Sequence, residues 1–384
     1  MGKGGKYLKK KPVVKRKKGK VLSIVLIVVA VLLVGGISFG AWYVNSLMNL
    51  LSRPDSPSKV EASVPTETYN LAEETIPQAT VMVEGEVVEE TTPEETWPVI
   101  VPDKNISNIL VVGQAAREGE DQLIADTMIL FSINREQKTL TMTSFMRDMR
   151  LVWPEFIDKD GKKHSGNNRI NMAYNMGSRW RGDATGGMDL LSSIIEYNFG
   201  VPVDHAVEVN FDLFIQAIDT LGGVWVDIDE DELKYLQDNY GYMENLEVGE
   251  NCLDGFQALC YARMRKVGHG DYERTERQRE VISSVLHSLT YADLMEIHGM
   301  FTQILPMITT NMTNKEITNY AFEFIPMLLD GLEIQSQRIP YDDNQYTMSV
   351  EIDGVIDYQL GCDTKATGQR LREFIGMVET ENAN

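Results

Sequence analysis

The sequence predicts an α/β fold in which a central mixed β-sheet is flanked by helices. Two observations predict this class. Apolar segments of strand length alternate with segments of helical periodicity through about 280 of the 384 residues. This stretch is long enough to bury one sizeable core, and no internal repeat divides it. We therefore expect a single domain at residues 105–384, with its core within about 105–290.

The individual elements follow from the local pattern. Continuous or alternating apolar residues predict strands, and apolar residues three and four apart predict helices. Strands are expected at 107–113, 126–133, 139–145, 206–211 and 224–228, and in alternating segments at 335–340 and 348–360. Helices are expected at 185–199, 211–221, 254–262, 272–289, 291–308, 313–329 and 365–378, and a polar loop at 157–169.

The N-terminus predicts a membrane anchor. Residues 1–20 carry ten Lys or Arg and no acidic residue, and the 24 residues of Val21–Val44 carry no charge. As a helix they reach roughly 36 Å, more than a bilayer core of about 30 Å. A cleaved signal peptide is the alternative, but its apolar core has only about 7–15 residues. The positive-inside rule then predicts a single-pass protein of the cell membrane, with a cytoplasmic basic tail and an extracellular C-terminal domain.

Residues 45–104 are predicted to form an acidic, disordered linker. Positions 50–104 hold 12 Asp or Glu but only three Lys or Arg, with several Pro, Ser and Thr. A strand within TVMVEGEVVEE (80–90) is the alternative for part of this region. Without residues 1–20, the chain has 26 basic and 57 acidic side chains. That net charge of −31 argues against a nucleic-acid partner.

The segment Tyr261–Arg279 gives the strongest indication of function. It holds five arginines in an otherwise acidic chain, and a guanidinium group fits phosphate oxygens two at a time. We therefore expect a polyanionic ligand, for which a diphosphate is the natural candidate. Arg263 and Arg265 alternate, so an extended backbone would direct both into one pocket. Two separate surface arginines are the alternative.

The helix expected at 272–289 places further polar residues near such a ligand. Its apolar face, continued to the N-terminus, carries Arg274, Arg277 and Gln278. A helix N-terminus favours a phosphate nearby. The alternative for Arg274 is an inward salt bridge with Asp271. Arg279 falls on a different face and is expected to be solvated.

Two aspartates lie at predicted strand ends. Asp126 opens one strand after a polar loop, and Asp148 follows the end of another. Carboxylates at strand ends can hold Mg²⁺, which completes its shell with phosphate oxygens and water. A turn or cap role for Asp126, and an ion pair of Asp148 with Arg147 or Arg150, are the alternatives.

Other catalytic classes lack support. The five histidines show no paired metal spacing, and no GxSxG, HExxH or P-loop motif is present. Serine hydrolase, zinc protease and nucleotide kinase activities are therefore not predicted.

Six segments in series give the chain a resemblance to the LytR-CpsA-Psr family of wall-polymer ligases. They are ADTMILFSI (125–133), SFMRDMR (144–150), RINMAYNMG (169–177), VEVNFDLFIQAIDTLGGVWV (207–226), LDGFQALCYARMR (253–265) and RTERQR (274–279). The resemblance covers roughly 105–290. It implies transfer of an anionic glycopolymer, such as teichoic acid or capsule, from a polyprenyl-diphosphate carrier to peptidoglycan.

The resemblance also implies roles for individual residues. Its catalytic carboxylates correspond to Asp126, Asp148 and Asp271, of which Asp126 and Asp148 would bind Mg²⁺ or Mn²⁺. Its diphosphate contacts correspond to Arg147, Arg263, Arg265, Arg274 and Gln278. One departure is Ile124, which stands where many members have an arginine. Two other functions stay open, a magnesium-dependent lipid diphosphatase and a non-catalytic polyprenyl-phosphate binder that regulates wall synthesis.

Overall fold

The computed structural model describes residues 79–88, 103–115, 124–268, 270–291, 303–304 and 307–377. All of them belong to one unit, Leu50–Asn384. The predicted basic tail, the predicted membrane span at 21–44 and most of the predicted helix at 291–308 lie outside the described residues. Within the described part of the chain, no helix combines the length and the apolar character needed to cross a membrane.

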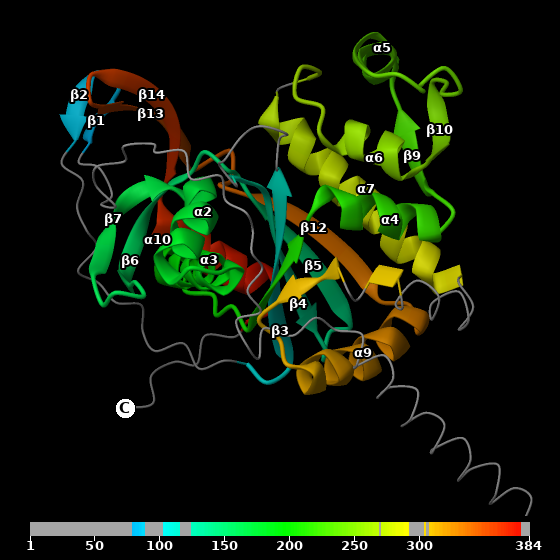
Figure 1. Ribbon diagram of the computed structural model, residues 1–384, viewed down its shortest axis with the longest axis horizontal. Helices are drawn as coiled ribbons and strands as arrows, with labels where there is room; N and C mark the ends of the chain where they lie inside the picture. The colour runs from blue at the N-terminus through cyan, green and yellow to red at the C-terminus, as the bar shows by residue number, and fades with distance from the viewer. Residues whose placement is uncertain are drawn as a thin grey trace, which may run out of the picture. The chain divides into compact units, whose positions relative to one another are not determined.

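A mixed six-stranded sheet forms the centre of the fold (Figure 1). Its order is β11-β8-β3-β4-β5-β12. Neighbours β3, β4 and β5 are antiparallel, whereas β8 runs parallel to β3 and β12 runs parallel to β5. The strands are β3 (Ile106–Ala115), β4 (Ile124–Asn134), β5 (Thr139–Phe145), β8 (His205–Val209), β11 (Thr309–Thr310) and β12 (Glu333–Ile339). The predicted central mixed sheet is therefore confirmed.

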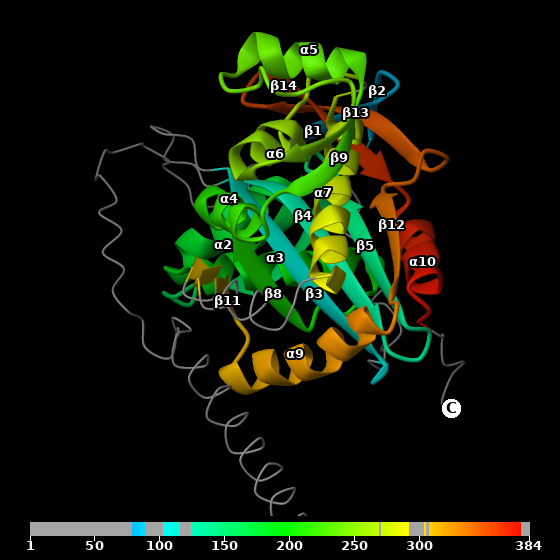
Figure 2. The ribbon, with the colours of Figure 1, turned by 90° about the vertical axis from the view of Figure 1, so that its right-hand side faces the viewer.

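Helices cover both faces of this sheet, as Figure 2 shows from a second direction. They are α2 (Ile170–Arg181), α3 (Ala184–Phe199) and α10 (Thr364–Phe374) on one face, and α7 (Asp271–Tyr291) and α9 (Asn314–Leu329) on the other. Strand alternation sorts the core residues. Leu110 and Leu130 pack toward α2 and α3, whereas Ile109 and Phe131 pack toward α7 and α9.

A smaller layer packs on the outer side of α7. It contains α4 (Phe211–Thr220), β9 (Val224–Ile228), α5 (Glu230–Asn239), β10 (Gly249–Leu253) and α6 (Gly255–Ala262). Val281 of α7 belongs to the core of this layer, and Leu286 of the same helix belongs to the core against the central sheet. Helix α7 is thus packed from two sides.

Part of the predicted disordered linker is ordered. Residues 80–88 form the hairpin β1 (Thr80–Val83) and β2 (Glu86–Val88), which pairs with β13 (Gln345–Ile352) in a sheet of order β14-β13-β1-β2. β14 spans Val355–Cys362. The two-residue turn has positive φ at both Glu84 and Gly85, as tight hairpin turns require. Composition predicted disorder here because it does not detect pairing with a strand about 270 residues away, as the Val81↔Val350 register shows.

The predicted polar loop at 157–169 is also wrong in part. Residues 163–169 form β7 (Lys163–Arg169), which pairs with β6 (Arg150–Ile157). Along β7 only His164 is buried, so the strand lacks the apolar alternation that would have predicted it. Backbone pairing with β6 holds the strand instead. Its far end, Arg169, leads directly into α2.

Candidate functional site

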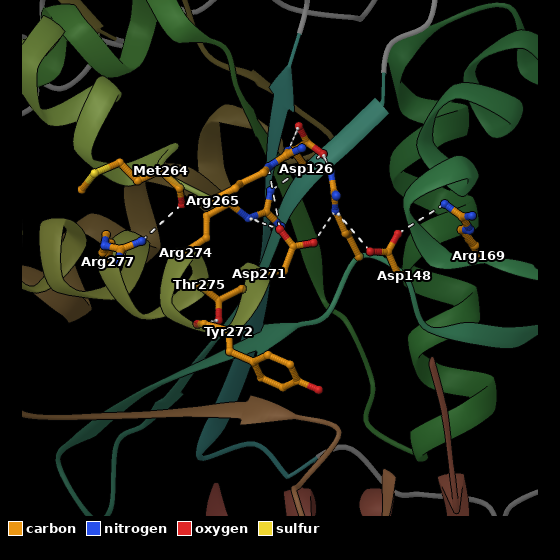
Figure 3. Close-up of polar contacts among 11 residues, drawn as sticks. Asp126, Asp148, Arg169, Met264, Arg265, Asp271, Tyr272, Arg274, Thr275 and Arg277 are labelled. Atoms are coloured by element: carbon orange, nitrogen blue, oxygen red, sulfur yellow. Dashed lines mark hydrogen bonds and ion pairs between the residues drawn. The ribbon is translucent and has the colours of Figure 1, made fainter. Parts of the chain in front are cut away.

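Six of the eight predicted site residues meet beside one end of the central sheet (Figure 3). Asp126 comes from β4, Arg147 and Asp148 from the turn after β5, Arg265 from the segment between α6 and α7, and Asp271 and Arg274 from the start of α7. We call these six residues the arginine–aspartate cluster. The convergence that the sequence predicted for them is present.

A β-bulge directs Asp126 into the cluster. Gly113 pairs with Thr127 and Gln114 pairs with Ala125, so Asp126 is an extra residue in β4. Strict alternation from Met128 would turn residue 126 toward α2 and α3, where Met128 and Ala125 are buried. The bulge breaks that alternation and presents the carboxylate to the arginines on the α7 side.

Arg147 is the central cation of the cluster. Its Nη1 donates to Asp126 Oδ1 at 2.9 Å, and its Nε lies 2.7 Å from Asp271 Oδ2 and 3.5 Å from Asp148 Oδ2. Burial by itself lowers the pKa of Arg147, but the three aspartates outweigh it and raise the pKa above its ordinary value. The Arg147–Asp148 ion pair predicted as an alternative therefore exists, within a larger network.

Asp271 and Asp126 each bind more than one arginine. Asp271 Oδ1 lies 3.1 Å from Arg274 Nε and 3.7 Å from Arg265 Nε, while Arg265 Nη2 donates to Asp126 Oδ2 at 2.7 Å. The inward bridge between Arg274 and Asp271, also predicted as an alternative, is present. Three guanidinium groups thus surround two carboxylates, much as they would surround an anionic ligand.

The cluster is accessible at its edge and buried at Arg274. Side-chain exposure is 33% for Asp148 and 32% for Arg265, but only 2% for Arg274. Within the described part of the chain, Arg274 Nη2 is buried without a hydrogen-bond partner. Burial lowers the pKa of Arg274 to about 10, so the group stays charged at neutral pH. A buried, charged donor with no acceptor indicates a place for a ligand oxygen.

Arg169 is a cluster neighbour that the sequence reasoning missed. Its Nη1 donates to Asp148 Oδ1 at 3.4 Å, and its Nη2 forms an ion pair with Asp357 of β14. The backbone N–H of Leu360 donates to the carbonyl of Asp148 at 2.9 Å. The small sheet is therefore joined to the cluster. Arg169 stood inside the quoted motif RINMAYNMG, but it ends strand β7, which the sequence did not predict.

The other two predicted contacts lie outside the cluster. Arg263 is exposed, and its guanidinium lies over the Phe211 ring at 4.6 Å from the centroid. The expectation that Arg263 and Arg265 share an extended segment is wrong, because Arg263 is the C-cap of α6 with helical φ and ψ. Gln278 is buried one turn beyond Arg274. Among the described residues, neither Arg263 nor Gln278 forms a hydrogen bond or ion pair with Asp126 or Asp271.

Two arginines of α7 differ from their predicted surroundings. Arg277 is buried and forms an ion pair with Glu232 at 2.6 Å. Arg279, predicted to be solvated, is half-buried, and its Nη1 donates to Ser144 Oγ of β5 at 2.9 Å. The prediction assumed that α7 has one buried face, whereas the helix packs against two layers.

The ion pairs of Asp126 predict a pH dependence. Burial raises the pKa of Asp126, but the hydrogen bond from Arg147 and the charges of Arg265, Arg147 and Arg274 outweigh it and hold the pKa below its ordinary value. The carboxylate thus stabilises the fold fully above its unfolded pKa of about 3.9, and this stabilisation is lost as pH falls through the folded pKa.

We expect the melting temperature of Asp126→Asn to fall less steeply than that of the parent below about pH 4. Asp189 provides a control of opposite sign, because burial raises its pKa. Asp189→Asn should steepen the acid decline, since the parent gains stability at Asp189 as pH falls. Equal slopes for all three proteins would contradict the ion-pair assignment.

The donor set bears on the implied divalent metal. No group of three His, Cys, Asp or Glu side chains suited to a metal occurs among the residues described in the structure. Asp126 and Asp148 do offer hard carboxylate oxygens on either side of Arg147. Mg²⁺ commonly takes one or two carboxylates and fills its shell with phosphate oxygens and water. The residues therefore fit a metal that arrives with a diphosphate, and not one held by protein alone.

A separate cavity of about 510 Å³ lies along α4. Its lining combines polar and apolar surface, with Asp212, Ile215, Gln216, Asp219 and Thr220 on the helix. It shares no residue with the arginine–aspartate cluster.

The fold and the cluster define an α/β protein in which guanidinium and carboxylate groups lie together at one end of the central sheet. Proteins of this class are suited to binding phosphate groups. Residues 73–367 match the LytR_cpsA_psr family, and the chain belongs to this family. The match begins before the β1–β2 hairpin and includes α10 up to Thr367, so the small sheet is part of the family region.

Several relatives have names that state an activity. The chain is 32% identical over 208 residues to the polyisoprenyl-teichoic acid–peptidoglycan teichoic acid transferase TagU of Bacillus licheniformis, covering 54% of this chain and 60% of TagU. For TagU of Bacillus subtilis (strain 168) the identity is 30% over 217 residues, covering 56% and 63%. Biofilm regulatory protein A of Streptococcus mutans is 30% identical over 239 residues, covering 60% and 54%. The chain thus spans less than two thirds of these relatives.

Solved structures share the fold. The protein gbs0355 from Streptococcus agalactiae aligns with a TM-score of 0.56 and 23% identity, covering 73% of this chain and 91% of that one. The structure described as TagT bound to LIIa-WTA aligns with a TM-score of 0.51 and 24% identity, covering 75% and 97%. Bacillus subtilis TagV gives 0.51 and 24%, covering 72% and 100%. At these identities the likeness supports the architecture.

Proposed function

We propose that this protein transfers an anionic glycopolymer from a polyprenyl-diphosphate carrier to peptidoglycan. Its domain acts outside the cell membrane, held there by an N-terminal anchor at residues 21–44. Membership of the LytR_cpsA_psr family supports this function, as does the similarity to TagU, whose name describes a teichoic acid transferase.

One observation carries the proposal. Arg147, Arg265 and Arg274 converge on Asp126 and Asp271, and a buried nitrogen of Arg274 lacks a hydrogen-bond partner among the described residues. A diphosphate offers the oxygens that such guanidinium groups bind, and it can replace the Asp271 carboxylate among them.

The reaction is a phosphoryl-type transfer. The C6 hydroxyl oxygen of a peptidoglycan sugar attacks the phosphorus atom nearest the polymer, and a new P–O bond forms. The P–O bond to the carrier breaks, polyprenyl monophosphate leaves, and the hydroxyl proton passes to a carboxylate. The arginines stabilise the negative charge that grows on the phosphate oxygens.

Asp126 and Asp148 remain the two candidates for the proton acceptor. Asp126 accepts two hydrogen bonds of 2.9 and 2.7 Å, and its pKa is lowered, which makes it a weaker base than an ordinary aspartate. Asp148 is more exposed and has longer contacts, of 3.5 Å to Arg147 and 3.4 Å to Arg169. These differences favour Asp148.

Mg²⁺ or Mn²⁺ is proposed as a companion of the diphosphate. The cluster contains three arginines and three aspartates, so its formal net charge is zero. It therefore has no excess positive charge to balance a diphosphate. A metal held by Asp126 and diphosphate oxygens would supply that charge and polarise the phosphate oxygens, and Asp148 would be either its second carboxylate ligand or the proton acceptor.

Asp148→Asn is expected to lower transfer about 100-fold, because a positioned base contributes at least that much. Its affinity for inorganic pyrophosphate should stay near that of the parent in isothermal titration calorimetry. Asp342→Asn is the matched control, since Asp342 pairs with Arg338 at the surface. If Asp148→Asn loses pyrophosphate affinity only when Mg²⁺ is present, Asp148 is a metal ligand and not the base.

The decisive experiment uses the full-length protein with a polyprenyl-diphosphate-linked polymer, with and without peptidoglycan oligomers. Mass spectrometry follows the lipid products. Polyprenyl monophosphate released only when the acceptor is present supports the ligase. Release without an acceptor identifies a lipid diphosphatase, and tight retention without turnover identifies a binding protein. Failure to bind the carrier at all overturns the proposal.

A further inference from the structure

Arg277 forms three buried contacts that are outside the arginine–aspartate cluster. Its Nε donates to Glu232 Oε1 of α5 at 2.6 Å. Its Nη1 donates to the carbonyl of Met264 at 3.2 Å, and its Nη2 donates to the carbonyl of Val267 at 3.3 Å. The side chain is 5% exposed. Every nitrogen of this guanidinium therefore has an acceptor, in contrast to Arg274.

The two carbonyls bracket Arg265 in the chain. The segment 264–267 lies between α6 and α7, so the carbonyls of Met264 and Val267 are not part of a helical hydrogen-bond ladder and need other donors. The side chains of Met264 and Val267 are buried in the core of the outer layer. With those side chains anchored and both carbonyls bound by Arg277, the backbone on either side of Arg265 is fixed. Arg265 extends from this support to Asp126, where its Nη2 donates at 2.7 Å.

We infer that Arg277 is a positioning residue that holds Arg265 at the diphosphate. The inference rests on the proposed function, because it assumes that the cluster binds a diphosphate. No contact given for the described residues joins Arg277 to Asp126 or Asp271, so it acts through the segment 264–267. A buried ion pair with Glu232 that only links α5 to α7 is the competing explanation.

Arg277→Lys separates the two explanations. Lysine keeps the charge opposite Glu232 but lacks the planar fork that reaches two carbonyls. We expect its affinity for inorganic pyrophosphate, measured by titration calorimetry with Mg²⁺, to fall about 10-fold, as is typical when the support of a ligand-binding group is lost. The double variant Arg277→Lys/Arg265→Ala should bind pyrophosphate as weakly as Arg265→Ala alone, because both changes act on the same contact.

Arg372→Lys is the matched control. Arg372 is also buried, and its Nη1 donates to the carbonyl of Phe199 at 2.7 Å, in another part of the domain. It should lower the melting temperature without changing pyrophosphate affinity. The inference is overturned if Arg277→Lys binds pyrophosphate as tightly as the parent. It is also overturned if Arg277→Lys lowers the affinity equally in the parent and in the Arg265→Ala background.

A second variant guards against loss of folding. Arg277→Met combined with Glu232→Gln removes both charges of the buried pair, and the glutamine oxygen still accepts from the backbone N–H of Asp229, as Glu232 does at the start of α5. It should bind pyrophosphate about as weakly as Arg277→Lys, and parent-like affinity would overturn the inference. A parent protein that binds no pyrophosphate and no lipid-linked diphosphate would instead refute the proposed function.

Discussion

Replacement of Arg147 by methionine is expected to lower transfer by about 1,000-fold. Arg147 contacts Asp126, Asp148 and Asp271 at 2.9, 3.5 and 2.7 Å, so its loss removes one ligand contact and the common partner of three carboxylates. Without this cation the three carboxylates repel each other, and the ionised form of Asp126 loses part of its stabilisation. The pKa of Asp126 should rise in the variant, because Arg147 is one of the groups that lower it.

This pKa change sets the sign of the stability effect. The contribution of Asp126 is present above its unfolded pKa of about 3.9, so the variant should lose more stability at pH 7 than at pH 4. Transfer assays and melting curves at both pH values test this. Arg147→Lys, which keeps the charge, should recover most of the stability but little of the transfer. Arg135→Met, which breaks a surface pair with Glu323, is the remote control and should transfer normally. Normal transfer by Arg147→Met would exclude Arg147 from the site.

Arg274→Met is expected to reduce transfer by about 100- to 1,000-fold while the melting temperature stays the same or rises. The side chain of Arg274 is 2% exposed, and two of its nitrogens, Nε and Nη2, lack a hydrogen-bond partner among the described residues. Burial lowers its pKa to about 10, which means that folding disfavours the charged form. Removing this charge should therefore relieve a cost that the ligand-free protein bears for function.

The competing role of Arg274, a structural bridge to Asp271, predicts the opposite change in stability. If the 3.1 Å contact mainly supports the fold, Arg274→Met melts at a clearly lower temperature. Arg279→Met is the matched control on the same helix. Arg279 is half-buried and binds Ser144, so its loss should affect stability while leaving transfer near that of the parent. Calorimetry and transfer assays on the two variants separate the explanations.

The paired charges explain how the same residues serve a fold and a ligand. In the described state, carboxylates occupy the guanidinium groups that the proposed diphosphate would bind. Asp271 lies beside all three arginines and belongs to the first turn of α7. A diphosphate gains these contacts only by displacing a carboxylate, so the ligand and the aspartates compete for one set of donors.

Local pattern predicted most of the strands and helices. The strands at 139–145 and 224–228 match their predictions residue for residue, because a buried strand or one with strict alternation carries its own pattern. A strand within 80–90 was predicted only as the alternative to disorder, and β7 was not predicted, since pairing partners and not apolar alternation hold these strands. The arginines near α7 were predicted to bind an anion because five of them lie close together in an otherwise acidic chain.

The sequence by itself determined the α/β class, the arginine-rich segment and the aspartates at strand ends, because hydrophobic periodicity and residue chemistry are local properties. Only the tertiary structure decided where each charge is directed. A bulge re-aims Asp126, a helix C-cap separates Arg263 from Arg265, and packing on two sides of α7 gives Arg274 and Arg277 different partners. Such contacts join residues far apart in the chain, and their geometry depends on register and packing that no local pattern encodes.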